Sequence, residues 1–242
     1  MAEHSAIEWT NATWNPATGC SKVSPGCAHC YAETFAERFR GVPGHPFEQG
    51  FDLRLWPERI ELPLRWRKPK MIFVNSMSDL FHEDIPDEFI ADVFDTMVRA
   101  EQHTFQVLTK RPDRLVALAP SLPWPSNVWV GVSIENRRFV QRADLLREVP
   151  AAVRFISAEP LLGPLDGLDL DGIHWLIAGG ESGAKHRRCD PDWVRALRDS
   201  CSDERVAFFF KQWGGRTSKA GGRTLDGRMW DEMPRARELV TS

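Results

Sequence analysis

The segment "MIFVNSMSDL", residues 71 to 80, joins an apolar run to a polar one, and the same succession recurs along the chain. The further apolar runs are "FQVLT" (105 to 109), "VWVGVS" (128 to 133), "VRFIS" (153 to 157), "HWLIAGG" (174 to 180) and "VAFFFK" (206 to 211). Short runs that are apolar on both faces predict buried parallel strands. A weaker pattern, "ATWNPATG" (12 to 19), predicts a first strand before them.

Longer amphipathic segments separate these runs. They predict helices over residues 30 to 40, 87 to 101, 136 to 148 and 191 to 200. Strands that alternate with helices imply crossovers between parallel strands. We therefore predict an α/β fold with about six to seven mostly parallel strands, in a single domain over residues 1 to 242 with a C-terminal extension from about 214 to 242.

The composition limits the function classes. The chain has 242 residues, a net charge of -3 and five cysteines. No stretch of about 18 consecutive apolar residues is present and the N-terminus has no leader pattern, so we expect a cytoplasmic protein without a membrane span. Thiols are kept reduced in the cytoplasm, which favours a metal or catalytic use over disulfides. The charge argues against a protein coated with basic surface, although a local basic groove is compatible with it.

Three of the cysteines lie close together in "TGCSKVSPGCAHCYAE", residues 18 to 33. Cys20, Cys27 and Cys30 could be buried core residues, but a Gly/Pro/Ser loop is a poor place for that. They could hold a structural zinc ion, with a fourth ligand from His29, His45, Cys189 or another distant residue. The interpretation we favour is a [4Fe-4S] cluster with three protein thiolates and one iron open to a ligand.

Several motifs carry a resemblance. They are "WNPATGCSKVSPGCAHCYAE", "FVNSMSDLFHE", "LTKRP", "VSIEN", "SAEPLL", "GGESG", "FFFKQWGG" and "LDGRMWDEMP". With them the chain resembles a family of phage-associated and bacterial proteins of unassigned function, related to the radical S-adenosylmethionine (SAM) enzymes. The C-x6-C-x2-C spacing is longer than the commoner C-x3-C-x2-C. His29 occupies the place where those enzymes usually carry an aromatic ring, and its imidazole could pack flat against the adenine of SAM or be a ligand.

The resemblance implies a partial (β/α) barrel that reductively cleaves SAM, with an external electron donor, to modify or repair a substrate. It implies that a residue after the second strand binds the SAM ammonium, and Asp79 is our choice, beside Ser78. The alternative for Asp79 is that it caps a following helix. Ribose contacts are expected after the fourth strand, at Ser133, Glu135 and Asn136. That segment could also be a polar turn in which Asn136 caps a helix.

Two later segments add candidates. Glu159 precedes Pro160, which favours an extended conformation, so we expect its carboxylate in the pocket. "AGGESG" is a candidate ligand-cradling turn through Gly179, Gly180 and Glu181, although its glycines could merely form a tight turn. Cys189 is interpreted mainly as structural. It is also a candidate catalytic hydrogen donor, as Glu159 is a candidate catalytic residue.

Basic residues follow the same strand ends. They are Lys110, Arg111, Arg114, Arg137, Arg138, Lys185, His186, Arg187, Arg188, Lys211 and Arg216, with His82 and Trp213 nearby for stacking. Such a ring suits a nucleotide or nucleic-acid substrate. Two alternatives remain at this point. One is a zinc-stabilised nucleic-acid-binding protein without catalysis, and the other is a barrel that keeps the cluster only as a structural or redox element.

Overall fold

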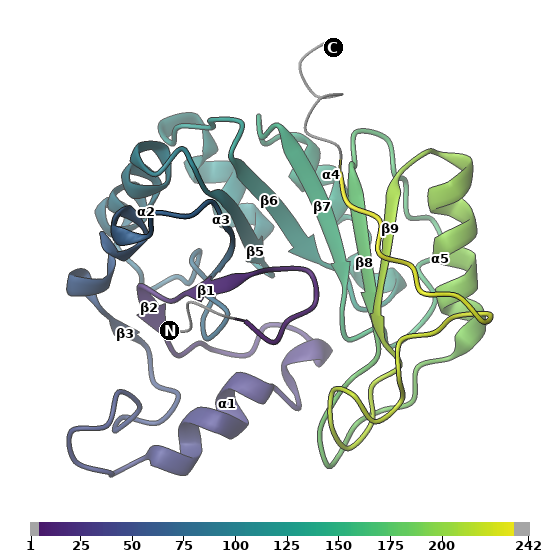
Figure 1. The fold of residues 1–242 in the computed structure, drawn as a ribbon, viewed down its shortest axis with the longest axis horizontal. Helices are drawn as coiled ribbons and strands as arrows, with labels where there is room; N and C mark the ends of the chain where they lie inside the picture. The colour runs from purple at the N-terminus through teal and green to yellow at the C-terminus, as the bar shows by residue number, and fades with distance from the viewer. Residues whose placement is uncertain (1–4, 235–242) are drawn as a thin grey trace. The chain divides into compact units, whose positions relative to one another are not determined.

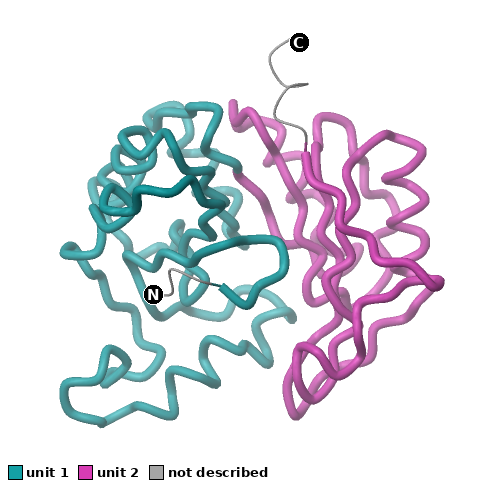
Figure 2. Tube along the Cα trace, viewed as in Figure 1, with its two compact units in different colours: residues 1–129 teal, residues 130–242 magenta. Residues whose placement is uncertain are grey.

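The structure is a computed structural model and describes residues 5 to 234. The chain divides into two compact units, Met1–Trp129 and Val130–Ser242 (Figure 2). The sequence-based assignment of one domain with a C-terminal extension remains a prediction. No helix in the described part of the chain has both the length and the apolar character needed to cross a membrane.

Parallel strands form the main sheet (Figure 1), and their order is β1-β4-β5-β6-β7-β8-β9. Their bounds are β1 (Ala12–Trp14), β4 (Met71–Val74), β5 (Thr104–Thr109), β6 (Val128–Ser133), β7 (Val153–Ala158), β8 (Trp175–Gly179) and β9 (Ala207–Gln212). In unit 1, β4 pairs in parallel with β1 and β5. In unit 2, β8 pairs in parallel with β7 and β9. The predicted α/β class with about six to seven mostly parallel strands is confirmed.

The strands form where the sequence is apolar on both faces. In β6 every residue is buried, and in β8 every residue is buried as well. Trp14 of β1 and Trp175 of β8 are both fully buried. Burial on both faces is the pattern of a parallel sheet covered by crossover helices. The polar segments at the carboxyl ends of these strands are thereby held at defined positions.

Unit 1 contains a short antiparallel pair and three α-helices. The pair is β2 (Ala17–Thr18) and β3 (Arg54–Leu55), and the helices are α1 (Tyr31–Ala36), α2 (Asp87–Arg99) and α3 (Pro112–Leu118). The 3-10 turns are η1 (Pro25–Cys27), η2 (Glu37–Phe39), η3 (Pro57–Arg59), η4 (Leu62–Arg65) and η5 (Ala119–Ser121). Helix α2 buries residues at helical spacing, among them Phe89, Val93 and Met97. Helix α3 was not predicted, although Pro112 at its first turn is a common helix start.

Unit 2 contains η6 (Arg137–Phe139), α4 (Arg142–Arg147) and α5 (Pro191–Asp203). Helix α5 lies beside β8 and β9 (Figure 1) and starts where the Asp190 side chain accepts a hydrogen bond from Asp192 N. The single helix predicted over 136 to 148 was wrong. The chain forms two short pieces there, because Asn136 caps η6 while Arg142 reaches back to the end of β6.

Candidate metal centre and cofactor site

The three-cysteine loop follows β2 in unit 1. Cys20 comes directly after Gly19, Cys27 ends η1, and Cys30 immediately precedes α1. Gly19 has a φ of 86°, and a Cβ added there would lie 2.2 Å from Asp52 O. Only glycine therefore fits at the start of the loop, and its conformation fixes where the loop departs from the sheet.

Hydrogen bonds fasten this loop to the segment that follows β4. Asn15 Oδ1 accepts a hydrogen bond from Met77 N at 2.9 Å, and Gly19 N donates to Met77 O at 2.9 Å. At the far end of the loop, Tyr31 OH donates to Ser76 O. The loop is thus held at both ends, although it contains little regular structure of its own.

The three thiols are half-buried and influence one another. Burial raises the pKa of the Cys20 thiol to about 12, and it also raises the pKa of Cys30. Cys27 contributes to both increases, so Cys27 lies within electrostatic range of both Cys20 and Cys30. Among residues 5 to 234, no group of three or more His, Cys, Asp or Glu side chains is arranged to hold a single metal ion.

Asp79 ties the segment after β4 to the segment after β5. Its side chain is 7% exposed. Oδ1 accepts hydrogen bonds from Thr109 Oγ1 at 2.7 Å and from Phe81 N at 3.0 Å, while Oδ2 accepts one from Lys110 N at 2.9 Å. The bond from Phe81 N closes a turn, and the next helix, α2, begins only at Asp87, so the helix cap that was the alternative to SAM binding was wrong. A contact of Asp79 with the SAM ammonium remains a prediction.

Two polar groups close to Asp79 in sequence are buried without a partner in the described part of the chain. They are Asn75 Nδ2 and Ser78 Oγ. Asn75 is 2% exposed and has a φ of 57°, a left-handed conformation that is uncommon outside glycine. Since buried polar groups are nearly always hydrogen-bonded, these two atoms are candidates to contact a bound ligand. Ser78 was predicted as such a contact.

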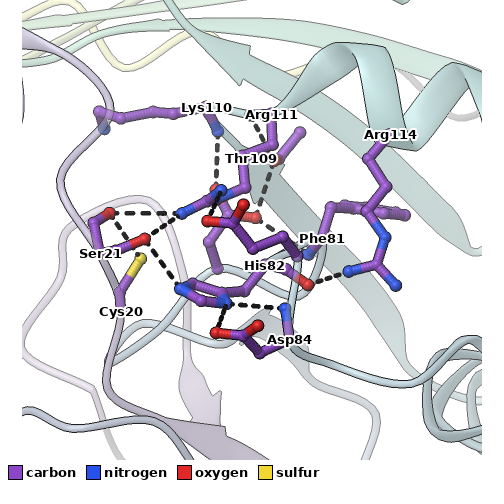
Figure 3. A network of polar contacts seen from close by, with 11 residues as sticks. Cys20, Ser21, Phe81, His82, Asp84, Thr109, Lys110, Arg111 and Arg114 are labelled. Carbon is purple, nitrogen blue, oxygen red and sulfur yellow. Dashed lines mark hydrogen bonds and ion pairs between the residues drawn. The ribbon is translucent and has the colours of Figure 1, made fainter.

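A second polar network joins the cysteine loop to the segments after β4 and β5 (Figure 3). Arg111 Nη2 donates to Ser21 Oγ at 2.6 Å, and His82 Nε2 lies 2.9 Å from the same oxygen. His82 Nδ1 accepts from Asp84 N, so the ring proton is on Nε2 and points to Ser21. Burial lowers the pKa of His82.

The sequence did not predict this network. His82 was expected beside the basic residues as a stacking surface, but it is only 4% exposed and its ring is held by Ser21 and Asp84. The expected stacking role was wrong because a buried ring offers no accessible face. His29 lies half-buried between Cys27 and Cys30, and its role as an adenine shelf or a ligand stays a prediction.

In unit 2, the segment after β6 is a capped turn with a buried ion pair. Glu135 is fully buried and contacts Arg142 at 3.2 Å, and Arg142 also donates to Ser133 O at 2.7 Å. Asn136 Oδ1 accepts from Arg138 N at 3.0 Å. The polar turn proposed as the alternative is therefore present. Ribose contacts by Ser133, Glu135 and Asn136 are not tested by these interactions.

Glu159 follows β7 and is paired with a lysine of β9. Lys211 Nζ lies 2.5 Å from Glu159 Oε1. Gly179 lies against the same carboxylate, since a Cβ added to it would be 3.5 Å from Glu159 Cδ. The carboxylate is thus held between two strand ends of unit 2, with its charge balanced by Lys211.

The segment "GGESG" packs against the backbone at Trp213. A Cβ added to Gly180 would lie 2.0 Å from Trp213 O, so this glycine is required by a close backbone approach. Glu181 is 5% exposed, and its Oε2 accepts from both the backbone N and the Nε of Arg187 at 2.8 Å. Cys189 lies beside Gly180, and burial raises the pKa of its thiol to about 12.

Apart from Lys110 and His186, the structure separates the predicted basic residues into two sets. Four are paired with carboxylates: Arg111 with Glu83, Arg114 with Asp87, Arg187 with Glu181, and Lys211 with Glu159. Five others are exposed, lie after strands of unit 2, and have no carboxylate within ion-pair distance in the described residues. These are Arg137, Arg138, Lys185, Arg188 and Arg216. We call these five residues the unit 2 cations.

The fold and the site define an α/β protein with a parallel sheet and a three-cysteine loop after its first strands. The chain belongs to the family described as protein of unknown function (DUF5131), whose model matches residues 4–234. This confirms the resemblance to a family of unassigned function. The phage association and the relation to radical SAM enzymes remain predictions.

The chain matches none of the curated proteins with which it was compared. Among solved structures it is similar to spore photoproduct lyase complexed with dinucleoside spore photoproduct, with 14% sequence identity and a TM-score of 0.43. The match covers 76% of this chain and 58% of that chain, so this chain spans less than two thirds of that protein. A likeness at this level carries no argument about activity.

Proposed function

We propose that this protein is an iron-sulfur enzyme that holds a [4Fe-4S] cluster on Cys20, Cys27 and Cys30 and uses SAM. One observation carries the proposal. The three thiols lie on a single short loop, and hydrogen bonds hold that loop at both ends. Thiolates are the ligands that iron-sulfur clusters take, and each would bind a different iron.

The donor set suits a cluster better than a structural zinc ion, which needs four ligands around one metal. Of the proposed fourth ligands, the His45 ring stacks on Phe39 at a centroid distance of 3.8 Å, and its Nδ1 already accepts from Phe47 N. Cys189 packs beside Gly180, and burial raises the pKa of its thiol to about 12. The thiol pKa values imply that metal binding releases protons, since the ligating form is the thiolate.

When bound, the cluster and SAM supply reductive cleavage of SAM, with an electron from an external donor. The residues of this chain bind and orient. In unit 1, Asp79 would accept from the SAM ammonium at Oδ2, which already accepts one hydrogen bond and has capacity for another. The unpartnered Asn75 Nδ2 and Ser78 Oγ would supply further polar contacts.

In unit 2, we propose that Ser133, Glu135 and Asn136 contact the ribose of SAM. We also propose that Glu159 and residues 179 to 181 contact the bound ligand. The ion pairs to Arg142, Lys211 and Arg187 fix the orientations of the three glutamates. Fixed carboxylates suit a binding role, because little conformational freedom is lost when a ligand arrives. Cys189, kept as a thiol by its raised pKa, remains a candidate hydrogen donor.

For the substrate we propose a nucleotide or nucleic acid, contacted through its phosphates by the unit 2 cations. These five side chains are exposed and not neutralised by neighbouring carboxylates, whereas the paired arginines and Lys211 are committed to internal contacts. Residues 182 and 215 are bridged in parallel beyond the ends of β8 and β9, which brings the segments carrying Lys185, Arg188 and Arg216 together. A phosphate backbone is the natural partner of such a set.

The test is SAM cleavage by reduced, cluster-replete protein. We expect release of 5'-deoxyadenosine and methionine even without substrate, and weaker SAM binding in Asp79→Ala, by about 1.5 to 3 kcal/mol. Thr109→Val is the matched control, because it removes a hydrogen bond to Asp79 while the carboxylate stays. If cluster-replete protein binds no SAM by calorimetry, the cluster is only structural or redox-active and the enzymatic proposal is wrong.

A further inference from the structure

Arg111 lies between the cysteine loop and the segment after β4 (Figure 3). Its side chain is only 12% exposed. Nη2 donates to Ser21 Oγ at 2.6 Å and approaches Ser21 O at 3.5 Å, and Nη1 lies 3.3 Å from Glu83 Oε1. Ser21 is the residue next to Cys20, so the guanidinium is held against the first proposed ligand of the cluster.

Several contacts around Arg111 hold its guanidinium in position. Arg111 N donates to Thr109 Oγ1 at 2.9 Å, which anchors the backbone at the end of β5. His82 Nε2 donates to the same Ser21 hydroxyl, so two donors converge on that oxygen. Arg111 Nε is buried and has no partner among residues 5 to 234. A charge this enclosed is costly unless it faces an anion.

The Glu83 carboxylate is one such anion, and the Cys20 sulfur would be a second when it binds the cluster as a thiolate. Cys20 Sγ lies 3.4 Å from Ser21 O, the oxygen that Arg111 Nη2 approaches at 3.5 Å, so the guanidinium lies next to this sulfur. The positive charge of Arg111 opposes the effect of the nearby Asp79 carboxylate on the pKa of Cys20. The positive charge of the preceding residue, Lys110, likewise acts to lower the pKa of Cys30. The two basic residues of "LTKRP" thus each lie near one of the three thiols. The sequence alone had grouped them with the other basic residues at the strand ends.

We propose that Arg111 raises the reduction potential of the cluster through its positive charge, held next to Cys20, and that Ser21, His82 and Glu83 are positioning residues for its guanidinium. The inference rests on the proposed cluster at Cys20, Cys27 and Cys30. Reduction adds one electron and therefore one negative charge, which a nearby cation in a poorly solvated site stabilises. Hydrogen bonds to the cysteine sulfurs and local charge are known to set cluster potentials.

The experiment is a redox titration of reconstituted full-length protein with dithionite as the electron source, followed by electron paramagnetic resonance. Arg111→Gln removes the charge while keeping a donor toward Ser21, and we expect a more negative midpoint potential. Glu83→Gln removes the carboxylate that partly neutralises Arg111, and we expect a more positive midpoint. Glu83 is exposed, so this second variant should fold. Arg99→Ala removes an equal charge on α2, where Arg99 pairs with Glu61 and Asp95, and should leave the midpoint unchanged.

The outcomes separate the two proposals. If the wild type takes up no iron and sulfide, the cluster proposal itself is wrong. If the cluster forms and Arg111→Gln has the wild-type midpoint, the role of Arg111 is wrong while the cluster proposal stands. If Arg111→Gln cannot hold a cluster, Glu83→Gln decides, because an unchanged or more negative midpoint there contradicts the inference.

Discussion

Thr109 Oγ1 donates a hydrogen bond to Asp79 Oδ1 at 2.7 Å and accepts one from Arg111 N at 2.9 Å. One hydroxyl group therefore connects the carboxylate proposed for SAM with the arginine proposed for the cluster. Both contacts lie at the carboxyl end of β5, where it meets the segment after β4. In a parallel sheet these ends lie at the same edge, so a short side chain is enough to join them.

Loss of this hydroxyl should destabilise the fold. Thr109→Val leaves a buried carboxylate oxygen without one of its donors, and we expect the free energy of unfolding to fall by about 1 to 3 kcal/mol. The change is measured by urea denaturation. Thr104→Val, at the half-buried start of the same strand, is the matched control. Equal stability of Thr109→Val and the control would show that the contact is not needed.

Substitution of the neighbouring residues Arg187 and Arg188 should change the free energy of unfolding by different amounts. Arg187→Ala leaves Glu181, only 5% exposed, without its partner, and we expect a loss on the order of 2 kcal/mol because an unpaired buried carboxylate is costly. Arg188→Ala removes an exposed cation and should change stability little. Urea denaturation of both variants gives the comparison, and a greater loss in Arg188→Ala would contradict the separation of basic residues made above.

Nucleic-acid binding should depend on the unit 2 cations. For short single-stranded and double-stranded DNA and RNA, affinity should fall with added salt, because each neutralised phosphate releases counterions. An Arg138→Ala, Arg188→Ala double variant should reduce the slope of log affinity against log salt concentration by about two. Arg99→Ala is the control, since Arg99 is paired with Glu61 and Asp95. No binding at low salt, or an unchanged slope in the double variant, rules out this substrate at these residues.

Acid should destabilise the metal-free protein through its buried histidines. His103 is 1% exposed and donates from Nε2 to Pro63 O at 3.1 Å, and burial lowers its pKa from 6.5. The unfolded chain therefore binds a proton that the folded chain does not, so stability is full above about pH 6.5 and falls below it. The loss at about pH 5.5 is at most about 1.4 kcal/mol for this residue.

The His103→Gln variant tests this dependence. Gln retains a donor toward Pro63 but does not titrate, so stability should fall less between about pH 7.5 and about pH 5.5 than in the wild type. His186→Gln, at an exposed position, is the control. The same fall in His103→Gln as in the wild type would exclude His103 as a source of the acid sensitivity.

The strands could be predicted from the sequence because burial on both faces leaves a local signature. The runs around Met71, Val128 and Val153 match β4, β6 and β7 to within about a residue. The first strand was also found near its true place, although only three residues of it pair with β4. Helix α3 was missed because its sequence, after the polar "TKRPDR", was treated as a loop.

The site was less predictable, because its contacts join residues far apart in sequence. The cysteine spacing marks the loop, but nothing local shows that Ser21 meets His82 and Arg111. The sequence also did not show which basic residues are enclosed and which are exposed. Arg111 and Arg188 both follow strands in polar segments, and only the structure shows that one is enclosed and the other exposed. In the sequence, the one available signal of these contacts was Thr109, which directly precedes "KRP".

The most direct measurement is the iron and acid-labile sulfide content of anaerobically purified protein, wild type and variants. We expect about four of each per chain in the wild type, and loss of both in the single variants Cys20→Ala, Cys27→Ala and Cys30→Ala, because no other thiolate replaces a missing one. Cys201→Ala, a fully buried cysteine of α5, should keep the wild-type content. Stoichiometric zinc without sulfide, or a full complement of iron and sulfide in Cys30→Ala, would contradict the proposed cluster.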